Sequence, residues 1–153
     1  GSIDSDFAGV ITGCATGPGR VGETWITPAM GEAYRHLHQL VIAHSVEVRH
    51  QGELVGGVYG VAYGGLFAAE SMFHRRRDAS NAAVTLLVAH LVARGYELID
   101  IQQVTPHTER LGGVLIPRDE YLRRLAIARD LPVTFGQELT GDISAFRAEP
   151  SAR

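Results

Sequence analysis

The chain has 153 residues, 45% of them hydrophobic, which is enough for one buried core and too little for two ordinary domains. Its formal net charge of −3 argues against a protein that holds nucleic acid by bulk electrostatics, because such domains usually carry a basic excess. No apolar stretch approaches the roughly 20 residues of a membrane-spanning helix, and a single cysteine, Cys14, excludes an internal disulfide. We therefore expect one cytoplasmic domain without a membrane span.

Two helices are predicted near the N-terminus. Apolar residues recur at three- to four-residue spacing over residues 4–15, which predicts a short amphipathic helix capped by Asp4 or Ser5. A second helix is predicted from residue 28 to about residue 40. Thr27 is placed to cap it, and its first residue is a proline, which loses no hydrogen bond at that position.

From residue 44 the pattern changes to the alternation and short β-rich runs that are typical of strands. Three strands are predicted, over residues 44–50, 54–63 and 66–73. They are separated by Gln51-Gly52 and Gly64-Gly65, turn dipeptides that are short enough to form hairpins. The pattern indicates an antiparallel meander.

A β-α-β unit is predicted next. A helix opens at residues 78–80 and carries a broad apolar stripe until Gly95 ends it. Residues 97–103 predict a strand, which a right-handed crossover would place in parallel beside an earlier strand. A further helix begins at Pro117 and ends before Pro132. Together the elements predict an α+β fold, an antiparallel meander plus a β-α-β unit with flanking helices.

The two ends of the chain differ in composition from its middle. Gly1 and Ser2 resemble an expression scar, and nothing after them has the charged start and apolar run of a signal peptide. Residues 132–153 mix Gly, Pro, Ser and charged residues, a composition typical of a partly disordered tail. We therefore expect the folded domain to cover residues 3–131.

Two polar groups stand out within apolar strands. Glu70 is costly to bury without a partner, and alternation places it on the face of Ala68 and Met72. Asp100 and Gln102 occupy alternate positions of their strand and should share one face. Structural roles remain open, a salt bridge for Glu70 and a hydrogen-bonded pair for the other two. In a catalytic site, Asp100 would orient Gln102, whose carbonyl would accept a hydrogen bond or proton from an attacking amine.

A basic loop lies between the third strand and the following helix. It contains Arg75, Arg76 and Arg77, with Ser80 at the helix start, a favourable place for a phosphate. A solvated basic loop is the alternative, because short charge runs are common on surfaces. An acetyl-CoA binder would normally have a glycine-rich turn at this junction, and the sequence has none there.

The histidines do not have the spacing of metal ligands. His36 and His38 are two residues apart and would face different sides of their helix. With only one cysteine, a thiolate zinc site is equally disfavoured. We expect neither a metal nor a cofactor.

A set of short segments between Phe7 and about Leu125 forms a recognisable pattern. These segments are residues 24–27, 33–38, 43–48, 52–60, 70–73 and 98–102. In this order they resemble the catalytic C-terminal domain of the leucyl/phenylalanyl-tRNA-protein transferase family.

The resemblance implies a GNAT-like acyltransferase fold. It also implies transfer of Leu, Phe or Met from the 3′ end of aminoacyl-tRNA to proteins that begin with Arg or Lys, which marks them for degradation by the bacterial N-degron pathway. Asp100 would support Gln102, which assists the attacking amine, and Glu70 would be the acid near the acceptor site. The residues expected to bind the donor side chain are Val58, Phe67, Met72, Leu87 and Trp25.

Two departures from the family pattern keep other hypotheses open. The sequence does not include a segment similar to the family's small amino-terminal domain, and Asn81 stands where many relatives have Lys. One alternative is tRNA-dependent aminoacylation of a small peptide or biosynthetic intermediate. Another is an acyl-CoA N-acetyltransferase that uses the loop at residues 75–80. A third is a non-enzymatic module that binds peptide amino termini through Glu70.

Overall fold

A five-stranded mixed sheet forms the centre of the computed structural model, which describes residues 1–17 and 24–146. Its spatial order is β1-β2-β3-β4-β5; neighbouring strands are antiparallel except β4 and β5, which are parallel. The strands are β1 (Ser2–Ile3), β2 (Ala43–His50), β3 (Glu53–Tyr63), β4 (Leu66–His74) and β5 (Leu98–Asp100). The predicted α+β class, the meander and the parallel β-α-β pairing are therefore confirmed.

The two predicted hairpins have the backbone geometry that their turn residues favour. Gln51 and Gly52 both have positive φ, 52° and 86°, as a two-residue type I′ turn requires. Gly64 has φ 54° in the second turn, where an added Cβ would lie 2.6 Å from the Ala128 carbonyl oxygen. Glycine is therefore required there both for backbone conformation and for close packing.

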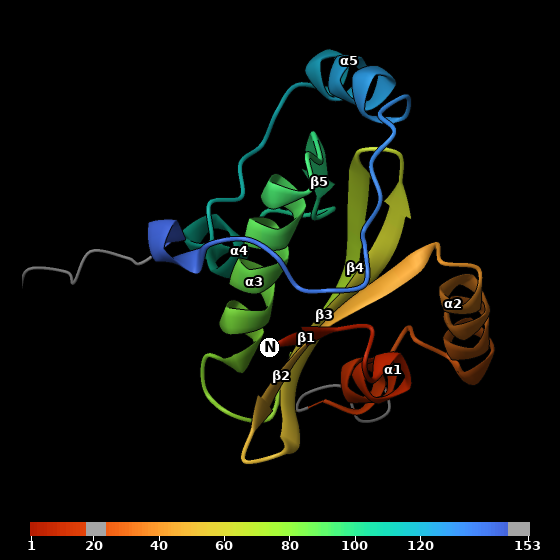
Figure 1. Cartoon of the computed structure of the whole chain (residues 1–153), viewed down its shortest axis with the longest axis vertical. Coiled ribbons are helices and arrows are strands. Elements are labelled where there is room, and N and C mark those ends of the chain that lie inside the picture. The colour runs from red at the N-terminus through yellow and green to blue at the C-terminus, as the bar shows by residue number, and fades with distance from the viewer. Residues whose placement is uncertain (18–23, 147–153) are drawn as a thin grey trace, which may run out of the picture.

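Helices cover both faces of the sheet (Figure 1). The helices α1 (Phe7–Thr16) and α2 (Pro28–Gln39) lie on one face, and α3 (Ala79–Ala93) lies on the other. Two further helices, α4 (Pro106–Arg110) and α5 (Arg118–Ala128), and the 3-10 helix η1 (Ile143–Phe146) follow β5. Within the described residues, no helix is long and apolar enough to cross a membrane.

The caps of the first two helices test the predicted boundaries. Thr27 accepts a hydrogen bond from the backbone N–H of Met30, as predicted for α2. The expected cap of α1 was wrong, because Asp6 caps that helix. Asp4 instead accepts a hydrogen bond from the backbone N–H of Ser45, and the hydroxyl of Ser5 donates to the buried Glu47 of β2. Both residues attach the N-terminal segment to the sheet.

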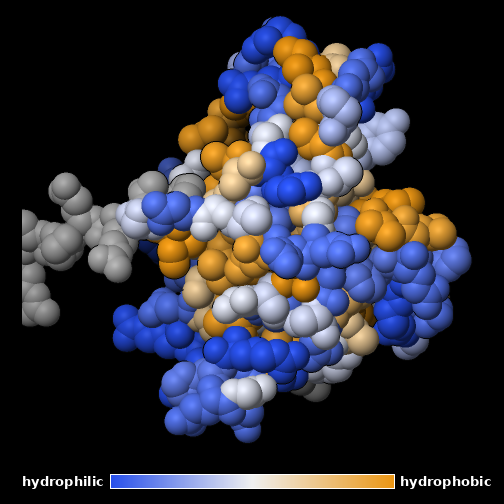
Figure 2. Space-filling model, in the orientation of Figure 1, coloured by the Kyte–Doolittle hydropathy of each residue, from blue (hydrophilic) through white to orange (hydrophobic). Residues whose placement is uncertain are grey.

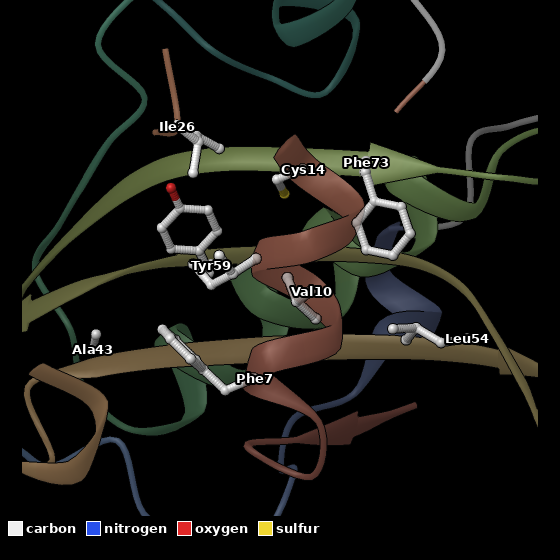
Figure 3. Packing of buried hydrophobic residues seen from close by; sticks show 9 residues of the cluster. Phe7, Val10, Cys14, Ile26, Ala43, Leu54, Tyr59 and Phe73 are labelled. Atoms are coloured by element: carbon white, nitrogen blue, oxygen red, sulfur yellow. The ribbon is translucent and has the colours of Figure 1, made fainter. Parts of the chain in front are cut away.

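The face under α1 and α2 has its own apolar core. Figure 3 shows α1 lying across the strands, with Phe7, Val10 and Cys14 packed over Tyr59 and Phe73. Val10 and Cys14 are fully buried, and the Phe7 and Tyr59 rings meet edge to face at 6.0 Å. Burial of each large side chain contributes about 1.5–3 kcal/mol, so this cluster fixes α1 on the sheet.

The second core, under α3, includes the segment that follows α5. Phe135 is 2% exposed and stacks on Phe67 with ring centroids 5.6 Å apart. The buried His90 of α3 donates from Nε2 to the Phe135 carbonyl at 2.8 Å and accepts at Nδ1 from the Thr140 N–H at 3.1 Å. Burial lowers the pKa of His90, so the ring stays neutral in this pairing. The packed core therefore extends past the boundary expected at residue 131.

Candidate active site

A cavity of about 450 Å³ lies between the second half of β4, α3, and the chain that follows β5. Its walls are mostly aliphatic, which suits an apolar side chain of a ligand. On the outside, apolar residues gather along the connection from α4 to α5 (Figure 2), where Val114 and Leu115 are 73% and 84% exposed. The lining includes Val58, Met72, Leu87, Leu91, Ile99 and Ile116.

Glu70 occupies a β-bulge at one side of this cavity. Tyr59 of β3 pairs with Ser71, but the next residue, Gly60, pairs with Ala69, which leaves Glu70 as the additional residue of β4. The alternation expected for β4 is therefore wrong at Glu70. Met72 packs against the core under α3, as Ala69 does, whereas regular alternation would have placed it on the face of Ala68. The bulge places the carboxylate between the cavity and the other sheet face.

Tyr34 of α2 meets Glu70 from that other face. Burial is the main cause that raises the pKa of Tyr34 to about 12, and the negative charge of Glu70 and a hydrogen bond to its carboxylate add to the shift. The phenol therefore remains a neutral donor to Glu70 at physiological pH. This contact satisfies part of the carboxylate without neutralising its charge.

Gln102 reaches Glu70 from β5, but not as part of a strand. The predicted strand over residues 97–103 was too long: β5 ends at Asp100, and Gln102 has φ 64° in the left-handed region. Asp100 Oδ1 accepts from the backbone N–H of Gln102 at 2.7 Å, which stabilises this turn. The side-chain Nε2 of Gln102 then donates to Glu70 Oε2 at 3.1 Å. Asp100, Gln102 and Glu70 therefore do lie together, as predicted. They meet through a turn that the Asp100 side chain stabilises, and not through a shared face of a strand.

The orientation of Gln102 decides which of its atoms can act. Because the amide nitrogen faces Glu70, the carbonyl Oε1 is the end that can accept a hydrogen bond from a substrate amine. Asp100 contacts the backbone of Gln102 and not its side-chain amide, so direct polarisation of that amide by Asp100 is not what this geometry shows. The second oxygen of Asp100 accepts from the Tyr121 hydroxyl at 2.7 Å.

All three arginines of the basic loop are exposed, and one of them is held by its neighbours. Arg75 donates to the Leu54 carbonyl at 2.9 Å and lies 5.3 Å from the centre of the Phe73 ring. Arg76 and Arg77 are exposed, the latter in an ion pair with the adjacent aspartate. Ser80 is buried, and its hydroxyl lies 3.4 Å from His74 Nδ1. Of the four residues expected to bind phosphate, the three arginines are therefore exposed, with Arg75 held at the Leu54 carbonyl, and Ser80 is buried.

Comparison with known proteins identifies the family. The family model for leucyl/phenylalanyl-tRNA protein transferase matches residues 1–126. The chain is 52% identical over 134 residues to the leucyl/phenylalanyl-tRNA–protein transferase of Pelodictyon phaeoclathratiforme, across 88% of this chain and 69% of that protein. The chain belongs to the leucyl/phenylalanyl-tRNA protein transferase family.

Two other similar members of the family are also longer than this chain. The leucyl/phenylalanyl-tRNA–protein transferase of Shewanella woodyi is 48% identical over 132 residues, which is 86% of this chain and 56% of that protein. The corresponding protein of Solidesulfovibrio magneticus is 51% identical over 130 residues, 53% of its length. The chain therefore spans about half to two thirds of the length of these transferases.

The structure brings together part of the predicted transferase site. Val58, Met72 and Leu87 line the cavity. Phe67 is fully buried in the second core, and Trp25, 46% exposed, is not among the described residues that form the lining. In the described part of the chain, no group of three or more His, Cys, Asp or Glu side chains is placed to hold a metal.

Sequence reasoning missed two tyrosines of the site. Tyr34 and Tyr121 contact Glu70 and Asp100 through their hydroxyls, across separations of 36 and 21 residues in the sequence. Both tyrosines lie in helical segments whose apolar spacing gives no indication of a hydroxyl partner. Tyr34 does fall within residues 33–38, one of the family-like segments, and this was the one available signal.

Proposed function

We propose that this chain forms the aminoacyl-transfer site of a leucyl/phenylalanyl-tRNA protein transferase with a GNAT-like arrangement. It would move Leu, Phe or Met from the 3′ end of aminoacyl-tRNA to the amino-terminal amine of a protein that begins with Arg or Lys. The observation that supports this most is the position of Glu70, Gln102 and Asp100 beside one apolar cavity.

The cavity would hold the donor side chain. Its aliphatic walls discriminate weakly among apolar groups, because each methylene contributes only about 1–3 kcal/mol. Leu, Met and Phe would therefore all enter, whereas a charged side chain would lose its hydration without a partner. Met72 lies in the wall next to the bulge, where it would contact the donor nearest to the reacting ester.

Gln102 and Glu70 would act on the acceptor. An α-amine has a pKa near about 8 and is partly neutral at physiological pH, so a hydrogen bond to Gln102 Oε1 suffices to orient its lone pair toward the ester carbonyl. The amine nitrogen forms the new peptide bond, the ester bond breaks, and the tRNA 3′-terminal oxygen leaves with a proton. The negative charge of Glu70 would attract the cationic first side chain of the acceptor.

Contacts to the tRNA itself would be local. The exposed Arg76 and Arg77 are the described candidates for phosphate contacts, in line with a chain whose net charge is negative. With these substrates, the reaction would take place in the bacterial cytoplasm, where it would mark proteins for degradation.

The decisive test is transfer of radiolabelled Phe from Phe-tRNA to an Arg-initiated peptide. The Pelodictyon relative serves as the positive control, and the same peptide with an acetylated amino terminus serves as the matched negative control. We expect labelled peptide only when the amine is free, and a lower yield when Arg is replaced by Glu. Transfer by the relative but not by this chain, even at high concentration of this chain, would reject the proposal.

Met72→Ala tests the assignment of the cavity. The enlarged wall should weaken use of Phe and Leu donors together, by about tenfold in kcat/KM, through lost contacts. Leu115→Ala, which changes an apolar residue that is 84% exposed, is the control. An unchanged kcat/KM for both donors in the Met72 variant would mean that the donor pocket lies elsewhere.

A further inference from the structure

The two oxygens of the Asp100 carboxylate are shared between two elements. Oδ1 accepts the backbone N–H of Gln102 at 2.7 Å, and Oδ2 accepts the Tyr121 hydroxyl of α5 at 2.7 Å. The short parallel strand β5 ends at Asp100, so the carboxylate stands where the regular backbone pairing of the sheet stops. Strand pairing therefore does not set the direction of the chain beyond Asp100.

We propose that Tyr121 is a positioning residue for aminoacyl transfer, acting through Asp100 on Gln102; this inference rests on the proposed function. A left-handed backbone is unfavourable for a non-glycine residue, so the turn at Gln102 needs a compensating contact. Asp100 supplies that contact only while its carboxylate stays at one χ2 angle. On its own, the χ2 torsion of an aspartate has only weak preferences. The Tyr121 hydroxyl selects that angle.

The position of α5 makes this hydroxyl a fixed donor. At its C-terminal end, α5 is held to the β3–β4 turn, because the Gly65 N–H donates to the Ala128 carbonyl at 2.6 Å and Ala128 is fully buried. The hydrogen bond to Asp100 is the main cause that raises the pKa of Tyr121 to about 12, so the phenol stays protonated wherever the enzyme would work. The neutral Tyr121 hydroxyl, on a helix fixed at its other end, thus holds the Asp100 carboxylate in place by donating a hydrogen bond and keeps its own proton.

The consequence reaches the reacting groups through the Gln102 side chain. With the turn held, Gln102 Nε2 faces Glu70 and Oε1 is presented to the acceptor amine. Without the Tyr121 bond, Asp100 can rotate, the turn opens more often, and the productive orientation of the amide is less populated. Ground-state binding of the donor depends on the cavity walls and should change little.

Tyr121→Phe tests the proposal, because it removes the hydroxyl and keeps the ring. The matched control is Tyr63→Phe, which removes a hydroxyl from a tyrosine that is 65% exposed at the end of β3. Backbone hydrogen exchange at Gln102 reports the turn directly, and kcat and KM for Phe-tRNA report its effect on transfer. We expect Tyr121→Phe to raise the exchange rate at Gln102 about three- to tenfold and to lower kcat by a similar factor, with KM nearly unchanged.

A double-mutant cycle separates positioning from general stabilisation. In Asp100→Asn the path from Tyr121 to Gln102 is already impaired, so adding Tyr121→Phe should cost much less than it does in the wild type. Additive losses, or unchanged exchange at Gln102 in Tyr121→Phe, would overturn the proposal. Absence of transfer by the wild-type chain would instead count against the proposed function, and hydrogen exchange would still decide whether Tyr121 holds the turn.

Discussion

At the scale of single residues, the site depends on positions that leave regular secondary structure. Glu70 is the additional residue of a β-bulge, and Gln102 follows the end of β5 in a left-handed turn. The two side chains come from the neighbouring parallel strands β4 and β5 or the chain that follows them, and they meet in the Gln102–Glu70 hydrogen bond. Irregular backbone of this kind concentrates at functional sites, because it aims side chains in directions that a regular strand does not allow.

Replacement of Gln102 by Ala should slow transfer with little effect on stability. The side chain makes one exposed hydrogen bond to Glu70, so its loss removes the proposed hydrogen-bond acceptor for the amine but leaves the core intact. We expect kcat to fall by roughly a hundredfold, the lower range for loss of an acid–base partner, with an unchanged thermal midpoint. Gln103→Ala, at the exposed neighbouring position, is the control. Full activity of the Gln102 variant would remove this residue from the mechanism.

The site tyrosines predict a stability change at alkaline pH. The pKa values of Tyr34 and Tyr121 are raised from 10.0 to about 12, so their contribution to stability is fully present below pH 10 and is lost as pH rises toward 12. The chain contains no lysine, so few other side chains titrate in this window. We expect the free energy of unfolding to fall more steeply in the wild type than in a Tyr34→Phe/Tyr121→Phe variant. Equal slopes in urea titrations at pH 10 and 11.5 would contradict the assigned partners.

The chemical candidates Glu70, Asp100 and Gln102 could be predicted from the sequence because polar residues within apolar strands are unusual. Their geometry could not be predicted. Periodicity assumes a regular strand, and it contains no signal for an additional residue at Glu70 or for a strand that stops at Asp100. The tyrosine partners come from α2 and α5, and contacts of this kind depend on how helices pack in three dimensions.

At the scale of elements, α1, α2, α3, α5 and the meander could be predicted because local signals agree with burial, whereas β1 and α4 were not predicted. The proline and Thr27 at the start of α2, and the glycine turns between the strands, act within a few residues. The cap of α1 was missed because Asp4, Ser5 and Asp6 are all good capping residues. Tertiary contacts decide among them: Asp4 and Ser5 are used by β2, which leaves Asp6 for the helix.

Two glycines in neighbouring helices should respond in opposite directions to alanine. An added Cβ at Gly13 of α1 would lie 2.6 Å from the buried Phe73 ring, whereas at Gly31 of α2 the nearest atom, on Ile11, is 3.5 Å away. Gly31→Ala should therefore raise the free energy of unfolding by roughly 0.5–1 kcal/mol through helix propensity. Gly13→Ala should lower it by about 1–3 kcal/mol through overpacking. Urea denaturation measures both; changes of the same sign would mean that α1 does not pack as described.

At the scale of the whole molecule, residues after α5 complete the core under α3. Phe135 contacts Phe67 and the stacked ring of His44, and His90 binds its carbonyl. The composition of residues 132–153 suggested a tail because isolated apolar residues among polar ones give no periodic signal. Burial of Phe135 and the hydrogen bonds of His90 to the Phe135 carbonyl and the Thr140 N–H attach this segment.

Phe135→Ala should therefore destabilise the whole domain, although it lies far from the proposed reacting groups. The expected loss is about 3–5 kcal/mol, because a buried ring is removed and a cavity remains between β4 and α3. Leu115→Ala, at an exposed apolar position, should change stability by less than about 0.5 kcal/mol. Urea unfolding followed by circular dichroism measures both variants, and a loss below 1 kcal/mol in Phe135→Ala would show that the segment is dispensable.

The β-bulge at Glu70 also bears on how the protein can evolve. An additional residue in β4 has no directly opposed side chain on β3, so a substitution there requires no matching change on the neighbouring strand. Glu70, to which we assign acceptor recognition, can therefore be replaced without altering how β3 and β4 pair. Selection for a different acceptor could therefore change this residue without a change in strand register, and its cost would lie in the lost contacts to Tyr34 and Gln102.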